Sequence, residues 1–523
     1  MFEDEIVFRV LRSASVCDSR VFDLGCPILE RMESEIDHLP SHTFDKDHLK
    51  RQIAIIKQAS DMAQDKIDYF SAHDDDTLLA ISVIEEFLRK KHRICYGGQA
   101  INAYLPAQHK FYDPEYSIPD YDFFTPSQHQ DLKQIAEDLF KAGFTEISAR
   151  EGMHEGTIKI YVNFIPVADL TAMDPRIYRI LSKRETRIDG ISYIDPNSLR
   201  MLMHLELSRP RGEVKRWEKV FERLMLFNEY VPIVPCRGFS RKKLSKSTLT
   251  LPQAQFVFRF VIQQRRMIAG ADLLPFYQQA VTKRSTKLNW ILGSTKPILF
   301  FSPEPVHDAG VLLSELSALS HKKIQTKIYR NQGLDLIPSI HVLHHNHAPL
   351  VIIIEQSACH SYINLPIKDG TVLGNGLVHN VLRVASMDTL ITLYFTLGFV
   401  QSTFFDRGAM DCLANQLVDL SILARREPEK FIFPFVSIRC VGHQHGIASL
   451  IRAKLARMTI KKKSKIKEIL QQAEAKYPSK GEARYPSKTA LSIRRTTQRV
   501  LRSKKSKRSK REVRSERNMN KDM

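Results

Sequence analysis

Long apolar runs and a secretory start are both missing from this 523-residue chain. The longest aliphatic run, Leu350–Ile354, is far shorter than the roughly 20 residues that a membrane-spanning helix requires. The first ten residues, "MFEDEIVFRV", are acidic and lack the basic start and apolar stretch of a secretory signal. We therefore expect neither insertion in a membrane nor secretion.

Cysteine is scarce and irregularly spaced. The chain has seven cysteines, and none forms a CxxC pair. Structural zinc sites built on such pairs are therefore not expected. An odd number of cysteines without a regular framework is typical of a protein from a reducing compartment.

Several catalytic signatures are also absent. No GK[ST] follows the paired glycines, which excludes a P-loop, and the zinc-deaminase signature H-x-E…P-C-x-x-C does not occur. We find no serine-hydrolase, kinase or Rossmann signature. Four histidines lie in "HVLHHNH" (341–347), where a hairpin turn before an apolar strand is a better interpretation than a zinc site.

What the chain does have is a basic end. Residues 451–523 contain 25 Lys and Arg against 6 Asp and Glu, whereas residues 1–450 contain 53 against 52. A flexible polycation binds nucleic acid through counterion release. A solubilising tail or a localisation signal would have the same composition. We expect disorder here, with one helix over 451–475.

The region before residue 91 is predicted to be mainly helical, ending in a helix over 75–91. "RICYGG" (93–98) then reads as a short strand that ends in glycines. "DYDFFT" (120–125) reads as a strand followed by a helix that begins near Pro126 and stops at Gly143. Residues 157–171 alternate and predict one or two strands. Residues 196–231 predict helices, with a break at 209–212.

A second copy of part of this pattern follows. "ILFFSPEPVHDAGVLLSELSALS" (298–320) resembles "YDFFTPSQHQDLKQIAEDLFKAG" (121–143), with FFSP on FFTP. In this alignment Asp120 corresponds to Pro297 and Asp122 to Leu299. The sequence therefore predicts a duplicated element that has lost its acids.

Asp120 and Asp122 are the first candidates for chemistry. Residues i and i+2 of a strand point to the same face, so two carboxylates would repel unless a cation lay between them. Mg²⁺ prefers such oxygen ligands, and two ions about 4 Å apart suit phosphoryl displacement. The predicted third ligand is Asp169, at the end of the apolar "VNFIPVAD". A solvated edge strand is the simpler alternative for the pair alone.

Gly97 and Gly98 lie where the short strand gives way to a helix. Glycine lets the backbone approach phosphate oxygens, and a helix start offers free N–H groups. On its own, a Gly-Gly pair most often marks an ordinary turn.

In order, these motifs resemble the nucleotidyltransferase superfamily related to DNA polymerase beta. More narrowly, "YGGQAINAYLP", "IPDYDFFTP", "KIYVNFIPVADLT" and "LMHLELSRPRGEVKRWEKV" resemble the catalytic poly(A) polymerase of large nucleocytoplasmic DNA viruses. The likeness is strong over about residues 85–235. It implies metal-dependent addition of AMP from ATP to the 3′ end of RNA.

Carried over to this chain, the resemblance makes Asp120, Asp122 and Asp169 the catalytic ligands of two Mg²⁺ or Mn²⁺ ions. Gly97 and Gly98 become the phosphate-binding turn. The basic segment "SRPRGEVKRWEKV" (208–220) offers Arg216 and Lys219 as triphosphate contacts, and a solvated helix face is the competing interpretation.

The predicted architecture is α/β (α+β). It comprises a helical region (1–90), a catalytic nucleotidyltransferase domain (91–235), a second, degenerate copy (236–450) and a basic tail (451–523). Expected partners are ATP, an RNA 3′ end, and a second copy or a viral partner subunit, in a virion or the host cytoplasm. Alternatives are the use of another NTP or acceptor, or a non-catalytic RNA-binding subunit.

Overall fold

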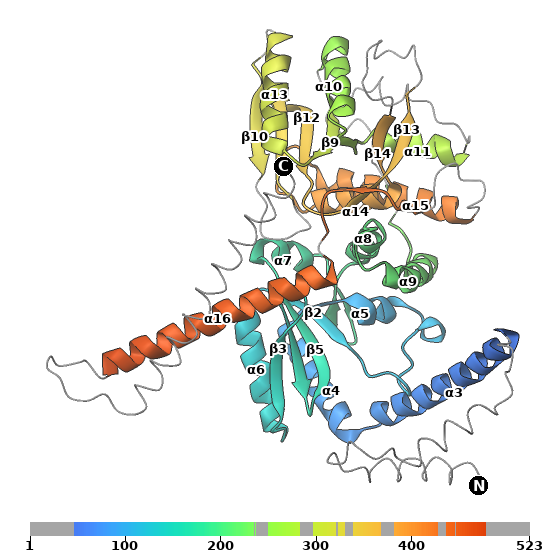
Figure 1. Cartoon of the computed structure of the whole chain (residues 1–523), viewed down its shortest axis with the longest axis vertical. Helices are drawn as coiled ribbons and strands as arrows, with labels where there is room; N and C mark the ends of the chain where they lie inside the picture. Colours follow the sequence, from blue (N-terminus) through green and yellow to red (C-terminus); the bar gives the residue numbers. More distant parts are fainter. Residues whose placement is uncertain are drawn as a thin grey trace, which may run out of the picture. The chain divides into compact units, whose positions relative to one another are not determined.

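The computed structural model describes residues 46–234, 236, 249–282, 297–320, 323–329, 338–367, 381–426, 436–444 and 446–476. The chain divides into two units. The larger contains two mixed sheets and their helices, and the smaller contains α16 (Ile447–Lys476) (Figure 1). No helix in these ranges is both long and apolar enough to cross a membrane.

Seven strands form the first sheet, in the spatial order β3-β4-β5-β2-β1-β7-β6. Their bounds are β1 (Ile94–Tyr96), β2 (Tyr121–Thr125), β3 (Ile147–Glu151), β4 (Thr157–Val162), β5 (Ile165–Ala172), β6 (Thr186–Ile188) and β7 (Ile191–Tyr193).

The helices of this half are α3 (Lys46–Ala72), α4 (Asp75–Lys91), α5 (Gly97–Tyr104), α6 (Gln128–Lys141), α7 (Pro175–Ser182), α8 (Pro196–Leu207) and α9 (Trp217–Tyr230). Two short 3₁₀ turns, η1 (Ala107–His109) and η2 (Val214–Arg216), lie among them. The strands and helices that the sequence predicted between residues 75 and 230 are therefore confirmed, whereas β3, α7, β6 and β7 were not predicted.

Local sequence explains several of these boundaries. Asp74 caps α4 by accepting a hydrogen bond from the Thr77 amide, while Arg89, Lys90 and Lys91 lie in its last turn. The helix after Pro126 ends before Gly143, which has a φ of 103° that favours glycine. The alternating segment 157–171 forms the hairpin β4–β5, which turns through Asn163 and Phe164.

Within the described residues, eight strands form the second sheet, in the order β10-β11-β12-β9-β8-β14-β13-β15. Their bounds are β8 (Met267–Ile268), β9 (Ile298–Ser302), β10 (Gln325–Tyr329), β11 (Ile340–His345), β12 (Ala348–Glu355), β13 (His360–Pro366), β14 (Val381–Ala385) and β15 (Cys440–Val441). Helices α10 (Leu251–Gln263), α11 (Leu273–Thr282), α13 (Pro305–Ala318), α14 (Met387–Leu397) and α15 (Arg407–Arg426) accompany it.

The second sheet repeats the topology of the first. In the first sheet β1 runs antiparallel to β2 and parallel to β7, and β2 runs parallel to β5. In the second, β8 runs antiparallel to β9 and parallel to β14, and β9 runs parallel to β12. The antiparallel edges β5-β4-β3 and β12-β11-β10 also correspond. The resemblance between residues 121–143 and 298–320 therefore reflects a duplicated sheet.

Ion pairs with a buried carboxylate recur at corresponding places. Arg93 pairs with Asp131, which accepts a hydrogen bond from Thr125. In the second sheet Arg266 pairs with Asp308, which accepts one from Ser302. The two copies thus share an internal framework as well as a strand order.

Cysteine pairing departs from the sequence-based expectation. The structure contains the disulfides Cys236–Cys412 and Cys359–Cys440, separated by 176 and 81 residues. The absence of a regular cysteine framework was therefore a poor guide, because residues this distant in sequence meet only through the tertiary fold.

The other expectations have mixed outcomes. The histidines of 341–347 lie on β11 and its turn into the buried strand β12, as predicted. The predicted basic helix is α16, and the rest of the tail, from 477 onward, lies outside the described residues. The predicted domain boundaries stay predictions.

Candidate active site

One row of side chains crosses four strands of the first sheet. Tyr96 on β1 faces Asp122 on β2, Asp122 faces Asp169 on β5, and Asp169 faces Lys159 on β4. Directly opposed residues point to the same face of a sheet. β2 and β5 run side by side (Figure 1), so the fold brings together two acids that are 47 positions apart in sequence.

The residues between the acids explain their orientation. Tyr121 and Phe123 alternate with the acids and are 3% and 0% exposed, and Leu170, beside Asp169, is equally buried. Their burial against the core turns Asp120, Asp122 and Asp169 to the opposite face. The edge-strand alternative is therefore excluded for Asp122, because β2 lies between β5 and β1.

The acids differ in their access to solvent. Asp120 lies just before β2 and is exposed at the rim, Asp122 is half-buried, and Asp169 is buried at 8% exposure. Burial, together with the charges of Asp120 and Asp169, raises the pKa of Asp122 to about 7. Partial desolvation and the charge of Asp169 also raise the pKa of Asp120. The site thus holds more negative charge than the protein compensates.

A cation fits this site on two grounds. Asp169 Oδ1 is buried and accepts no hydrogen bond from the described residues, so a strong acceptor atom is left for a ligand. Clustered carboxylates with raised pKa values favour either a proton or a divalent ion. The side chains that would hold such an ion are those of Asp120, Asp122 and Asp169.

Lys159 partly supplies the missing positive charge. Its Nζ lies 2.5 Å from Asp169 Oδ2, and its side chain is 38% exposed. Burial opposes the ammonium charge, but Asp169, Asp120 and Asp122 outweigh this and raise the pKa of Lys159. Sequence reasoning missed this residue, since only strand register places it beside the acids.

Gly97 begins α5 directly beside Asp122. Its φ is +75°, and a Cβ at this position would lie 2.5 Å from Asp122 Oδ2. Only glycine combines this backbone conformation with such a close approach. The predicted turn and the predicted acids are therefore neighbours, and the interpretation as an unrelated turn is excluded.

Gly98 opens on a second group of side chains. A Cβ there would meet the Tyr112 hydroxyl at 2.4 Å and Arg223 Nη1 at 2.7 Å. The Arg223 guanidinium lies 4.3 Å from the centre of the Phe111 ring and donates a hydrogen bond to the Tyr112 hydroxyl at 3.1 Å. Sequence reasoning missed Arg223, although it lies one helical turn after Lys219.

The other two predicted nucleotide contacts, Arg216 and Lys219, lie at the start of α9, the helix that also carries Arg223. Arg216 is exposed and pairs with Glu206 at 3.3 Å, and its charge lowers the pKa of Asp122 against the dominant effect of burial. Arg223, burial and Arg216 together lower the pKa of Lys219. The three cations thus form one electropositive group near the acids. The roles of Arg216 and Lys219 in nucleotide binding stay predictions.

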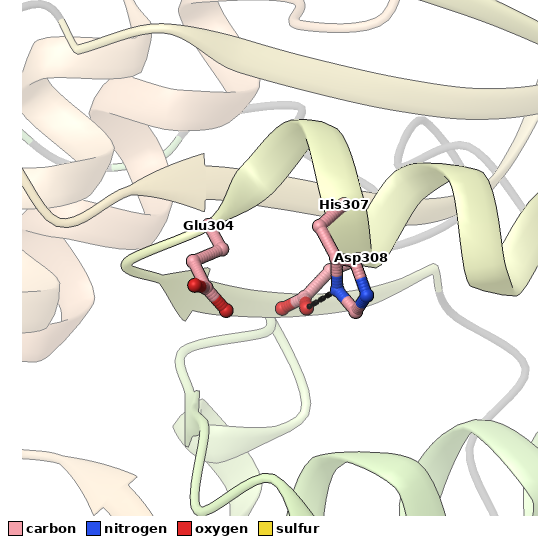
Figure 2. A group of neighbouring side chains, drawn as sticks. All are labelled: Glu304, His307 and Asp308. Atoms are coloured by element: carbon pink, nitrogen blue, oxygen red, sulfur yellow. Dashed lines mark hydrogen bonds and ion pairs between the residues drawn. The ribbon is translucent and has the colours of Figure 1, made fainter.

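A different group of possible metal ligands lies on the second sheet. Glu304, His307 and Asp308 at the start of α13 have ligand atoms within 4.8 Å of one another (Figure 2). Asp308 is already held by Arg266, whose Nε lies 2.8 Å away, and this pair corresponds to Arg93–Asp131 of the first sheet. We interpret the cluster as structural, because the guanidinium already neutralises its buried carboxylate.

Comparison with known proteins agrees with this geometry. Residues 82–213 match the family model described as "Poly(A) polymerase catalytic subunit". The likeness to that family covers this segment of the chain. The segment contains Gly97, Gly98 and all three acids, and it ends just before η2 and α9.

Two relatives bear the same name. A poly(A) polymerase catalytic subunit of African swine fever virus (strain Badajoz 1971 Vero-adapted) is 30% identical over 184 residues, which cover 34% of this chain and 38% of the relative. One from Acanthamoeba polyphaga mimivirus is 28% identical over 209 residues, or 38% and 35% of the two chains. The matched region thus spans little more than a third of the length of either relative.

A solved structure extends the likeness in fold. The crystal structure of the Megavirus polyadenylate synthase matches with a TM-score of 0.60 and 20% identity, over 82% of this chain and 85% of that chain. The expected α/β class, with two sheets and a helical segment before them, is thereby confirmed.

Proposed function

We propose that this chain is a polynucleotide adenylyltransferase that adds AMP from ATP to the 3′ ends of RNA. The observation that carries the proposal is the row formed by Asp122 and Asp169, with Gly97 in contact with Asp122. This row lies within the segment that matches the poly(A) polymerase catalytic family. Three carboxylates beside a glycine turn suit nucleotidyl transfer, because charge develops on phosphate oxygens that need cations and backbone donors.

The acids would hold two divalent ions, Mg²⁺ or Mn²⁺. Such ions, when bound, lower the pKa of an attacking hydroxyl and neutralise the charge on the triphosphate and departing pyrophosphate. Within the chain, Asp169 is buried on β5, which lies between β2 and β4. Asp169 would orient the RNA 3′-hydroxyl, while Asp120 and Asp122 would face the triphosphate.

The glycine turn and the cations of α9 would receive the triphosphate. Gly97 and Gly98 leave room for phosphate oxygens beside the first amides of α5. Arg223, braced by Phe111 and Tyr112, offers a fixed guanidinium, and Lys219 is close enough for its pKa to respond to Arg223. Arginine forks bind phosphate with defined geometry, so Arg223 is the strongest candidate, ahead of Arg216 and Lys219.

RNA would approach with help from the basic tail. Residues 451–523 carry a large positive excess, which favours phosphate contact without sequence preference. A viral partner subunit or a second copy of the chain would add surface for the product, and the virion or the host cytoplasm is the proposed location.

The decisive test supplies a labelled RNA, Mn²⁺ or Mg²⁺ and each NTP in turn to the full chain. Extension with ATP alone, lost in Asp120→Ala and in Asp169→Asn, would support the proposal. Equal extension with UTP or CTP would replace adenylyl transfer with a less selective nucleotidyl transfer. Tight RNA binding without extension by any NTP would contradict catalysis and favour a binding subunit.

The tail has its own test. Truncation after residue 450 is expected to weaken RNA affinity and to reduce the slope of log affinity against log salt. An unchanged slope would contradict RNA contact by the tail, whereas the adenylyl transfer proposal would stand.

A further inference from the structure

Lys159 lies on one of the oxygens that a metal ion would need. Its strand, β4, pairs with β5 so that Lys159 and Asp169 are direct cross-strand neighbours. The ammonium lies 2.5 Å from Asp169 Oδ2, while Asp169 Oδ1 is buried without a partner. Half of the coordinating capacity of Asp169 is therefore taken by a side chain of the protein.

The second sheet shows that this lysine accompanies the acids. Asp122 opposes Asp169 in the first sheet, and Leu299 opposes Ile352 at the corresponding place in the second. The cross-strand neighbour of Ile352 is Val342, where the first sheet has Lys159. Where the acids are lost, the cation is lost as well, and three buried apolar residues take their place. The fold itself therefore does not require a lysine at this position.

The three acids are less closely gathered than the cluster on α13. Within the described ranges, only Glu304, His307 and Asp308 have ligand atoms that all lie within 4.8 Å of one another. In the first sheet the ammonium of Lys159 contacts Asp169, at the end of the row of acids. A metal ion shared by all three carboxylates would have to draw them together and take over the oxygen that Lys159 now holds.

We propose that Lys159 is an internal competitor of the metal ion shared by Asp120, Asp122 and Asp169. Its ammonium neutralises Asp169 in the metal-free protein and leaves when that ion binds. The flexible stem and partly exposed head allow this movement toward solvent. Lys159 thus acts through Asp169 and weakens metal binding before substrate arrives. This inference rests on the proposed function, because it requires a metal site at the acids.

The test measures Mn²⁺ binding to the nucleotide-free full chain by electron paramagnetic resonance of the free ion. Lys159→Met keeps the apolar stem and removes the charge, and Lys159→Arg keeps the charge. We expect Lys159→Met to tighten the first Mn²⁺ dissociation constant by roughly tenfold, since one contacting unit charge is removed. Lys159→Arg should remain within about twofold of the parent protein, because a guanidinium can hold the same carboxylate.

The matched control is Lys215→Met, which removes one exposed lysine from η2. It is expected to leave the Mn²⁺ dissociation constant unchanged, because exposed charges without a contact are screened. Equal tightening by Lys215→Met and Lys159→Met would overturn the inference in favour of general electrostatics. An unchanged or weakened constant in Lys159→Met, with a normal thermal unfolding curve, would also overturn it.

The outcome also distinguishes this inference from the proposed function. Asp169→Asn should abolish the tight Mn²⁺ site in both the parent protein and Lys159→Met. Mn²⁺ binding that is lost in Asp169→Asn but insensitive to Lys159 would sink the competitor role alone. The same binding in every variant would refute the metal site, and with it both proposals.

Discussion

The two sheets of this chain share a topology and differ in their chemistry. Both keep an arginine that pairs with a buried aspartate, Arg93–Asp131 in one and Arg266–Asp308 in the other. Only the first has Asp122 and Asp169 in opposed register; the second has Leu299 and Ile352 there. We infer that the arginine–aspartate pairs stabilise the shared fold. The acids destabilise the first sheet, which keeps them for function.

The largest effect should come from copying the second sheet into the first. Asp122→Leu is expected to lower the rate of AMP addition by at least ~10³-fold, because it removes a carboxylate aimed at the developing charge. The rate is measured by primer extension with saturating ATP. The matched change, Leu299→Met, alters the second sheet within its core volume and should leave the rate unchanged. Similar losses of rate in both variants would contradict a specific role for the carboxylate of Asp122.

Removing a shared ion pair should destabilise either copy. Arg93→Met and Arg266→Met each leave a buried aspartate without its guanidinium, and breaking such a pair costs about 3–5 kcal/mol. The free energy of unfolding is measured by urea titration. The exposed pair Lys133–Glu137 provides the control, since Lys133→Met should cost less than about 1 kcal/mol. A negligible change in the free energy of unfolding for Arg266→Met alone would show that the second copy does not depend on this ion pair.

The two copies also differ in the surroundings of a corresponding glycine, Gly97 in the first sheet and Gly270 in the second. Gly97→Ala would combine a strained φ of +75° with a Cβ 2.5 Å from Asp122 Oδ2, and we expect a loss of activity of roughly 10²-fold from displacement of that carboxylate. In the second sheet, a Cβ on Gly270 would have ordinary contacts, with Leu299 N the nearest atom at 3.6 Å. Gly270→Ala should therefore be nearly neutral. Equal rates for the two variants would refute the role of the Gly97 turn.

The smallest effect concerns stability and pH in the metal-free protein. The pKa of Asp122 is raised to about 7, so its charged form disfavours the folded state above that pH, and the penalty fades as pH falls and the carboxyl takes a proton. Asp122→Asn should therefore raise the melting temperature more at pH 8 than at pH 5. A pH-independent difference would contradict the raised pKa. Leu299→Asn provides no such gain, because it buries a polar amide.

The raised pKa has a consequence for metal binding as well. Because protons compete with divalent ions for the same carboxylates, metal affinity is expected to weaken as pH falls below about 7. The second sheet has apolar residues at the corresponding positions, so no pH dependence of this kind is expected there.

Sequence and structure divide the explanation between them. Alternating residues around Asp120 and Asp122, and the glycines after "RICY", determined which residues would share a face and where the chain could turn, because strand periodicity and glycine conformations are local properties. The apolar segment that ends at Asp169 gave the candidate for the third acid, and the family resemblance then agreed with it.

Only the tertiary structure decided what lies next to these residues. It placed Lys159 on Asp169, braced Arg223 over Phe111 and paired four cysteines. These neighbours come from strand register and helix packing across tens to hundreds of positions, which local patterns do not encode. The repeat was visible in sequence over residues 298–320, but its full extent emerged only from strand order, because burial preserves topology while allowing most side chains to change.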